Sequence, residues 1–357
     1  MGEAMMGSRV GLAKMIPSLM PLLKWFRPTM EQFARKFTDP FLRQAFPLLE
    51  YSIPDVPFFL HLVKHAYGYN GSTAWPVGAS FEFARSMEKR YQDLGGEVNY
   101  KSDVEQIMTE GGRAVGVKLE DGSEHKADIV ISNADGRKTI MGLLGGRFTD
   151  EKIRRYCGEP DDETPMAVQV FLGVDRDLFS EPSALVQLLE RPLDVANHTT
   201  DSLEMQTYGF DPTMAPKGKG VIKVELASSW SYWKGLYADK SRYDEEKQKV
   251  AETIIDVLDR TRFPGIKGQV EEVDVPTLVT WERFVGGTHG WLSMPNKKFS
   301  PMDLLFGKGY ATLPGLSNCY LVGTWATAAG ALFANALSGR KAIAAICDGN
   351  GKTFRSA

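Results

Sequence analysis

The residues best suited to hold a cofactor lie near the C-terminus, between Asn318 and Cys347. A short apolar run, Cys319 to Val322, is followed by a turn that contains Gly323 and Gly330. Many small side chains follow in the predicted helix: Ala331, Ala334, Ala336, Ser338, Gly339, Ala342 and Ala344. Small residues let a backbone approach a flat ligand, and a helix start offers N–H groups to an anion or carbonyl oxygen. The pattern fits a ligand-binding turn, and it also fits the packed last strand and helix of any α/β domain.

The cysteines and histidines form no pattern typical of a disulfide framework or a metal site. Cys157, Cys319 and Cys347 are scattered and odd in number, which fits a reducing compartment. His61 and His65 stand four residues apart, a spacing that can bind a metal ion on one helix face. The sequence offers no evident third ligand, so we expect an ordinary pair on a helix surface and no metal site.

Size and composition indicate a globular protein that does not bind nucleic acid. The 357 residues are enough for two domains, and a formal net charge of −3 excludes a bulk basic field for nucleic acid. The most apolar N-terminal stretch, Val10 to Phe26, contains Pro17, Pro21, Lys14 and Lys24 and does not predict a membrane span. We expect a cytoplasmic protein, with peripheral membrane contact as a further expectation.

Several segments resemble, in order, those of the phytoene dehydrogenase-related FAD oxidoreductases, the carotenoid desaturase and isomerase group of the amine-oxidase superfamily. They are WPVGAS from Trp75, SDVEQI from Ser102, VISNAD from Val130, DPTMAPKGKG from Asp211, LVGTW from Leu321 and LSGR from Leu337. The chain departs from the pattern at Ala79, where the family has a second glycine. It departs again at Ala328-Ala329-Gly330-Ala331, where the family has a run of glycines.

The resemblance implies FAD as cofactor and a set of residues around it. The cofactor-binding residues would be Val104 at the adenine end; Asn133 and Ala134 beside the same nucleotide; Gly323, Thr324 and Trp325 at the ribityl and phosphate groups; and Gly330, Ala331 and Leu332 at the flavin ring. Three further side chains, Tyr69, His289 and Trp291, are expected to face the substrate. No acid–base pair stands out, so no catalytic residue is predicted.

The predicted fold is of the mixed α/β class, with four segments in order. We expect a helical cap over 1–74, the middle part of a Rossmann-like FAD-binding domain over 75–163, an antiparallel-sheet substrate domain over 164–290, and the C-terminal part of the FAD-binding domain over 291–357. The cap is rich in Met, Phe and Leu, which suits plain apolar packing, a substrate channel or a surface that dips into a membrane.

Local patterns predict individual elements. Strands are expected over 97–101, 104–109, 114–119, 124–126, 127–132, 164–174, 221–226, 270–278 and 280–284. Asp121-Gly122, before 124–126, is a strong signal for a hairpin turn. Helices are expected over 79–94, with Phe81, Met87 and Tyr91 on or near the buried side, and over 243–260. Gly95-Gly96 suits a left-handed helix end.

The given sequence contains no Gly-x-Gly-x-x-Gly turn after a strand, the motif that holds the FAD pyrophosphate in this family. We therefore expect a truncated or split enzyme, with a separate N-terminal nucleotide-binding half as a partner. The leading interpretation is a phytoene dehydrogenase-type FAD oxidoreductase that acts on a long apolar, isoprenoid or polyene-like substrate. The alternative is a non-catalytic fragment or partner subunit that binds an apolar ligand without its own FAD.

Overall fold

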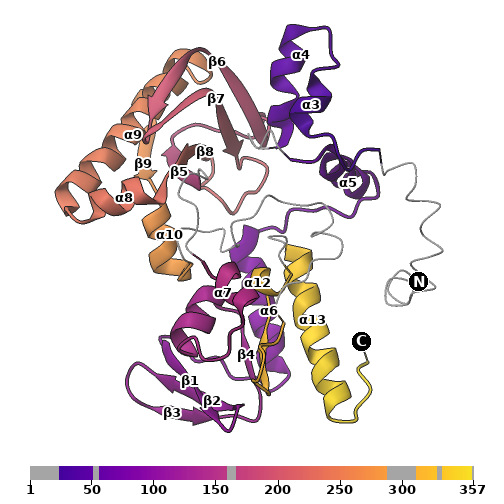
Figure 1. Ribbon diagram of the computed structural model, residues 1–357. Coiled ribbons are helices and arrows are strands. Elements are labelled where there is room, and N and C mark those ends of the chain that lie inside the picture. The colour runs from indigo at the N-terminus through magenta and orange to yellow at the C-terminus, as the bar shows by residue number, and fades with distance from the viewer. Residues whose placement is uncertain (1–23, 51–55, 159–165, 288–310, 328–331, 356–357) are drawn as a thin grey trace. The chain divides into compact units, whose positions relative to one another are not determined.

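The structure is a computed structural model that describes residues 24–50, 56–158, 166–287, 311–327 and 332–355 (Figure 1). The chain divides into two compact units, each described by itself. The first unit comprises Met1–Val77 and Val186–Leu188, and the second comprises Gly78–Leu185 and Leu189–Ala357. The finer division into cap, cofactor and substrate domains stays a prediction. No helix in the described ranges is long and apolar enough to cross a bilayer.

The part of the first unit that the structure describes consists of separate helices of 4 to 12 residues, as its prolines predict. They are α3 (Met30–Ala34), α4 (Pro40–Ala45), the 3-10 helix η1 (Pro47–Glu50) and α5 (Phe58–Tyr69). Thr29 begins α3 by accepting a hydrogen bond from the Gln32 amide, and Asp39 begins α4 by accepting one from the Leu42 amide. Helices α3 and α4 are therefore each started by a side-chain cap and run for no more than two turns.

Aromatic rings hold this unit together. Phe33 and Phe58 stack with ring centroids 4.0 Å apart, and Phe26 stacks on Phe59 at 3.9 Å. Trp25 meets the Phe33 edge at 5.7 Å. The predicted Phe-rich packing is thus present between helices that are too short to be stable alone.

Apart from residues 186–188, the second unit contains a five-stranded sheet in the order β6-β7-β8-β5-β9. Its strands are β5 (Met166–Val174), β6 (Ala184–Val195), β7 (His198–Thr207), β8 (Gly220–Ser228) and β9 (Val270–Asp274). β5 pairs antiparallel with both β8 and β9, which confirms an antiparallel sheet in this part of the chain. Ala196 and Asn197 join β6 to β7 with φ values of +54° and +60°, as a tight type I′ hairpin turn requires.

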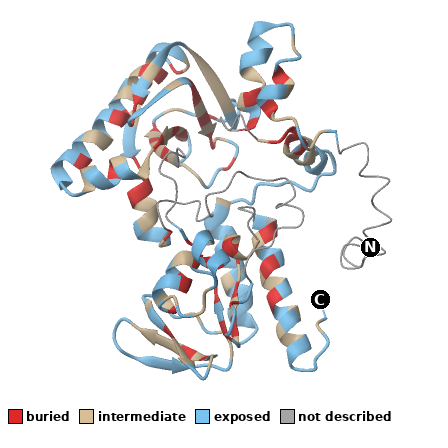
Figure 2. Ribbon diagram, viewed as in Figure 1, coloured by how far each residue is buried: buried red, intermediate tan, exposed pale blue. Residues whose placement is uncertain are grey.

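Helices α8 (Trp230–Tyr237), α9 (Lys240–Thr261) and α10 (Leu278–Val285) pack against this sheet. Figure 2 shows the buried stripe along α9, which the 3.6-residue period predicts. Trp233 and Ile254 from the helices and Ile222 from β8 are completely buried in the shared core. This core is the larger of the two in the described chain.

A second set of strands precedes and follows that sheet in sequence. β1 (Val104–Glu110), β2 (Arg113–Leu119) and β3 (Glu124–Lys126) form an antiparallel meander. β4 (Val130–Ser132) pairs in parallel with β10 (Cys319–Leu321). The meander, including its Asp-Gly turn, and the strand that ends in Asn-Ala-Asp are confirmed.

Helices accompany these strands. They are α6 (Ala79–Asp93), the π-helix η2 (Lys138–Leu143), α7 (Glu151–Tyr156), α12 (Thr324–Thr327) and α13 (Leu332–Gly349). Gly95 follows α6 with φ of +88°, so the predicted left-handed helix end is confirmed. The mixed α/β class is likewise confirmed.

Three local predictions are wrong. Residues 280–284 lie in α10 and not in a strand, because Thr277 caps that helix and exchanges hydrogen bonds with Thr280. Residues 97–101 form no strand, since they pair with none of the described strands. The hairpin of β6 and β7 and helix α8 were not predicted.

The third wrong prediction concerns the burial of helix α6, which forms as a helix where expected. Its predicted inner residues Phe81, Met87 and Tyr91 are 65%, 52% and 54% exposed. With Val98 and Tyr100 they line a mainly apolar groove of about 510 Å³. The helix has the amphipathic pattern, and no described element covers its apolar face.

Candidate functional site

The candidate site lies where two parallel strands end. Cys319 pairs with Val130 and Leu321 pairs with Ser132, so β10 and β4 run side by side in one direction. Asn318 Nδ2 donates a hydrogen bond of 2.6 Å to the Asp128 carbonyl and ties the two strand starts across 190 residues. Both strands then enter polar turns. The carboxyl ends of adjacent parallel strands are where open α/β sheets bind their ligands.

Asn133 and Gly323 face each other across these turns. Gly323 has φ of +84°, a conformation that favours glycine. A Cβ atom added to Gly323 would lie 2.3 Å from Asn133 Oδ1, so the backbone of one turn contacts the side chain of the other. The structure therefore brings together two residues predicted to bind the same cofactor.

The Val-Gly and Ser-Gly-Arg segments of the sequence are joined by one buried hydrogen bond. The Gly323 N–H donates to Ser338 Oγ at 2.7 Å, and Ser338 Oγ donates to the Asn335 carbonyl at 2.6 Å. Asn335 Nδ2 also lies 3.4 Å from Thr324 Oγ1. Ser338 thus fixes the turn against α13, and the Gly323 amide already has a partner inside the protein.

Trp325 packs in the core against the turn that follows β4. It is only 7% exposed and belongs to the smaller core, with Val130 and Leu321. A Cβ atom on Gly136 would lie 2.3 Å from the Trp325 ring, so the glycine is needed for this packing. Trp325 was predicted beside the ribityl and phosphate groups, and its burial indicates a role in holding the turn.

The turn after β4 is also fixed by its own hydrogen bonds. Asp135 Oδ1 accepts a hydrogen bond of 2.8 Å from the amide of Lys138, the first residue of η2. Ser132 and Thr139 join their hydroxyl oxygens at 2.8 Å in the interior. Asn133 and Ala134 are exposed between these anchors. A rigid frame therefore presents one amide side chain and a short stretch of backbone to solvent.

The remaining predicted residues are distributed as follows. Gly330, Ala331, His289 and Trp291 lie outside the described residues. Leu332 begins α13 and is 66% exposed; Val104 begins β1 opposite Leu119; and Tyr69, which is 93% exposed, ends α5 in the first unit. The roles of these residues stay predictions.

Asp211 is a buried polar residue for which the sequence predicted no role. It is 4% exposed, and its Oδ2 accepts a hydrogen bond of 3.0 Å from the Gly78 amide. Its Oδ1 accepts from the amide of Thr213 at 3.0 Å. Gly78 and Asp211, which lie in two of the segments that carry the family resemblance, therefore meet at one carboxylate. An aspartate that begins a turn could have been recognised from the Asp-Pro-Thr sequence, but its distant partner could not.

Ala79 follows in the left-handed conformation, with φ of +56°. This is the position at which the family has glycine and this chain does not. The backbone keeps the glycine-type geometry, so the substitution places a methyl group where it costs about 1 kcal/mol or more.

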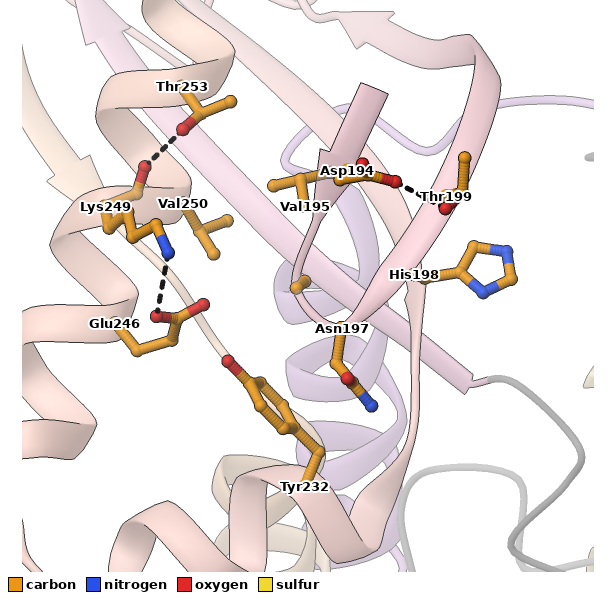
Figure 3. A pocket seen from close by; sticks show the side chains of 11 residues that line it. Asp194, Val195, Asn197, His198, Thr199, Tyr232, Glu246, Lys249, Val250 and Thr253 are labelled. Carbon is orange, nitrogen blue, oxygen red and sulfur yellow. Dashed lines mark hydrogen bonds and ion pairs between the residues drawn. The ribbon is translucent and has the colours of Figure 1, made fainter. Parts of the chain in front are cut away.

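The pocket in Figure 3 lies elsewhere, between the β6–β7 turn and helices α8 and α9. Its volume is about 670 Å³, and it is lined by polar side chains that include Asn197, His198 and Lys249. Burial and the neighbouring Glu246 carboxylate raise the pKa of Tyr232 to about 12. None of the predicted site residues lines this pocket.

The buried thiols are not candidates for nucleophilic chemistry. Burial raises the pKa of Cys319 to about 11, and burial together with Asp135 raises that of Cys157 to about 11. A reactive cysteine needs a lowered pKa and access to solvent. Both side chains belong to the smaller core instead.

Comparison with known proteins identifies related sequences. A family described as flavin containing amine oxidoreductase matches residues 34–347. A prolycopene isomerase, chloroplastic, of Arabidopsis thaliana is 28% identical over 246 residues, which cover 66% of this chain and 39% of the isomerase. A lycopene-forming phytoene desaturase of Pseudescherichia vulneris is 31% identical over 271 residues, covering 71% of this chain and 53% of the desaturase. The chain thus spans about two fifths of the first relative and about half of the second.

The fold also matches solved structures. An oxidoreductase from Methanosarcina mazei superposes with a TM-score of 0.57 at 18% identity, covering 92% of this chain and 71% of that one. At this identity the likeness concerns the fold alone. It agrees with the mixed fold described above.

Proposed function

The chain belongs to the flavin containing amine oxidoreductase family, and on that premise we propose that it is a phytoene dehydrogenase-type oxidoreductase for a long apolar, polyene-like substrate. The cofactor of the family is FAD. The observation that carries the proposal is the junction of Asn133, Gly323 and Ser338 at the carboxyl ends of β4 and β10. The names of the isomerase and the desaturase support the substrate class.

The residues at this junction fit a dinucleotide. Gly323 leaves no side chain between the two turns, and Asn133, Thr324 and Asn335 offer amide and hydroxyl groups suited to ribose and ribityl oxygens. Val104, Ala134, Gly330, Ala331 and Leu332 complete the proposed cofactor-binding set. FAD, when bound, supplies hydride or electron transfer at a carbon–carbon bond, and the protein orients the substrate and excludes water.

The substrate side of the proposal concerns Tyr69, His289 and Trp291. We propose that they contact the apolar ligand, and we assign no catalytic acid or base. Tyr69 supports this because a fully exposed tyrosine ring at a helix end is an available apolar surface with one polar atom.

The proposal is tested by flavin retention. The chain is expressed with riboflavin, alone and together with a separate nucleotide-binding half that contains Gly-x-Gly-x-x-Gly, which is the partner we propose. After gel filtration, flavin absorbance is measured. We expect bound flavin, at least in the co-expressed sample, and conversion of an added polyene. Absence of flavin from both samples would refute the proposal.

A matched pair of variants makes this test specific. Ser338→Ala removes the acceptor of the buried Gly323 amide and should weaken flavin retention about tenfold or more. Ser86→Ala removes a similar hydroxyl, which donates to the Phe83 carbonyl at 2.7 Å on exposed α6, and should leave retention unchanged. Equal losses in both variants would argue against a specific role for the turn.

A second candidate is a partner subunit that binds an apolar ligand without its own FAD. The hydrogen bond from the Gly323 amide to Ser338 Oγ favours this candidate, because that amide is already bonded within the protein and does not need a flavin as its partner. A chain that binds a polyene in the absence of flavin, and that gains no flavin with the co-expressed half, would support this candidate over the first.

Peripheral membrane contact is proposed for the first unit. Phe41, Leu42 and Leu49 are 62%, 43% and 57% exposed on α4 and η1, and Arg43 lies among them. Exposed apolar side chains beside basic groups suit an anionic bilayer surface. Flotation with anionic liposomes should carry the chain upward, and Phe41→Ser should reduce this more than Phe81→Ser on α6. Recovery of all the protein in the soluble fraction would refute the contact.

A further inference from the structure

A buried carboxylate and two histidines form a chain of contacts in the first unit. Glu50 ends η1, and His61 and His65 lie one turn apart on α5. Glu50 Oε1 lies 2.8 Å from His61 Nδ1, and the Nε2 atoms of His61 and His65 are 3.1 Å apart. Lys64 pairs with the second oxygen of Glu50. The sequence shows only the spacing of the two histidines, and the fold brings the Glu50 carboxylate next to His61.

The burial of this group fixes one histidine and leaves the other accessible. The side chain of Glu50 is 4% exposed and that of His61 is 10% exposed, whereas His65 is exposed. Phe46 and Phe58 pack against the His61 ring, with centroids 5.6 and 5.8 Å away. The rings and the carboxylate hold His61 in one orientation, so its rotamer is set before any ligand arrives.

The hydrogen bond to Glu50 also sets the tautomer of His61. A carboxylate beside Nδ1 favours a proton on that nitrogen, which leaves the lone pair of Nε2 directed at His65. Histidines that bind metals commonly donate their other N–H to a carboxylate in this way. Glu50 therefore orients the His61 ring and fixes its tautomer, as the outer carboxylate of a metal site does.

We propose that His61 and His65 bind one divalent transition-metal ion, with Glu50 as the outer carboxylate and water in the remaining coordination positions. Two nitrogens bound at 2.0–2.1 Å to a tetrahedral ion lie about 3.3 Å apart, close to the observed 3.1 Å. Imidazole nitrogens select Zn²⁺, Ni²⁺ or Cu²⁺ over Mg²⁺ and Ca²⁺. The site goes beyond the flavin chemistry and does not depend on it.

Water has to supply the other ligands, since no cluster of three or more metal-ligating side chains occurs among the described residues. Two histidines at i and i+4 present both imidazoles on one helix face, as the two histidines of a His-Glu-x-x-His zinc motif do. The ion would be held by α5 alone, and the existing contact between His61 and Glu50 joins α5 to η1. The expected affinity is therefore that of a two-histidine site and not that of a closed structural zinc site.

The test uses the full chain without a histidine tag, titrated with Ni²⁺ in a calorimeter. We expect one saturable equivalent. His65→Ala, at an exposed position, should weaken binding at least tenfold. Glu50→Gln, which keeps the shape of the side chain and removes its charge, should weaken binding about 10–100-fold. His125→Ala removes a histidine from exposed β3 and should leave binding unchanged.

Spectroscopy separates this site from scattered weak binding. The electron paramagnetic resonance spectrum of the Cu²⁺-loaded chain should report two nitrogen ligands in the wild type and one in His65→Ala. Circular dichroism of Glu50→Gln checks that the fold is retained. Absence of saturable binding up to 1 mM Ni²⁺, or equal affinity in wild type and His65→Ala, would overturn the proposal. Each of these outcomes leaves the flavin test unaffected.

Discussion

The second unit contains two regions that differ in how they bury their apolar residues. The antiparallel sheet and helices α8 to α10 enclose a dry core in which Trp233, Ile222 and Ile254 have no solvent exposure. The strands around β4 and β10 share a smaller core, and α6 in the same unit exposes most of its apolar face. The motifs of the family lie mainly in the second region. The larger dry core and the proposed cofactor-binding turns thus lie in different parts of one compact unit.

The largest expected effect is in the sheet core. Trp233→Ala should lower the free energy of unfolding by about 3–5 kcal/mol, because it empties a fully buried site. It also removes the indole N–H that donates to Ser228 Oγ at 2.8 Å. Trp75→Ala, at a side chain that is 46% exposed, is the control and should cost under about 1 kcal/mol. Urea unfolding measures both, and similar losses would show that the sheet core is not the stable part.

The next-largest expected effect is on the reactivity of the cysteines, and it tests whether solvent reaches the smaller core. At pH 8, Cys319 should react with iodoacetamide about 100-fold more slowly than a free thiol, because its pKa lies two units above the ordinary value of 9.0. Cys347, which is half-buried on α13, should be modified first. Mass spectrometry of the native chain follows each site. Equal rates at Cys319 and Cys347 would mean that this core opens readily.

The raised pKa values of Cys157 and Cys319 also determine how their contribution to the free energy of unfolding changes with pH. In the unfolded chain, Cys157 and Cys319 lose their protons near pH 9, whereas in the folded chain they keep them until about pH 11. The folded state is therefore favoured by this contribution below pH 9. The contribution decreases as the pH rises from about 9 to about 11.

A smaller effect is expected at the junction of the two turns. Gly323→Ala should lower the free energy of unfolding by about 1–3 kcal/mol, since a methyl group there meets Asn133 Oδ1 and the φ of +84° strains alanine. Gly339→Ala, inside α13 with no neighbouring atom within 4 Å of the added group, should stabilise the chain by up to about 1 kcal/mol. Thermal unfolding distinguishes the two variants. If Gly323→Ala left the stability unchanged, the close contact between Gly323 and Asn133 would be refuted, and with it this part of the proposed site.

The smallest effect concerns Ala79. Ala79→Gly should raise the free energy of unfolding by about 0.5–1 kcal/mol, because glycine relieves the left-handed strain and its own entropic cost is smaller. Ala84→Gly, in the interior of the same exposed helix, should lower it by about 1 kcal/mol. If both variants lost stability, the turn before α6 would not be strained.

The sequence predicted this unit well where a local signal exists. The Asp-Gly hairpin of β2 and β3, the left-handed Gly95 and the amphipathic α9 all depend on neighbours within a few residues, and all three are confirmed. The family, the FAD cofactor and the mixed fold were also predicted, from motifs whose order along the chain is specific.

What could not be predicted depends on distant partners. The bond from Gly78 to Asp211 and the pairing of Gly323 with Asn133 and Ser338 require the folded chain. The exposure of α6 was missed for the same reason, since periodicity shows that a helix has an apolar face and not whether another element covers it. Residues 280–284 were misassigned because a short apolar run fits a strand or a helix, and the cap at Thr277 decides between them.

The hydrogen bond between Asn318 and Asp128 has a consequence for biosynthesis. A ribosome adds roughly 5–20 residues per second, so β4 waits on the order of 10–40 s for the strand that pairs with it, 190 residues later. The antiparallel sheet, whose strands all lie between these two, can form in the meantime. Throughout that interval the nascent chain carries an unpaired strand, Val130–Ser132, whose backbone groups are open to pairing with another chain.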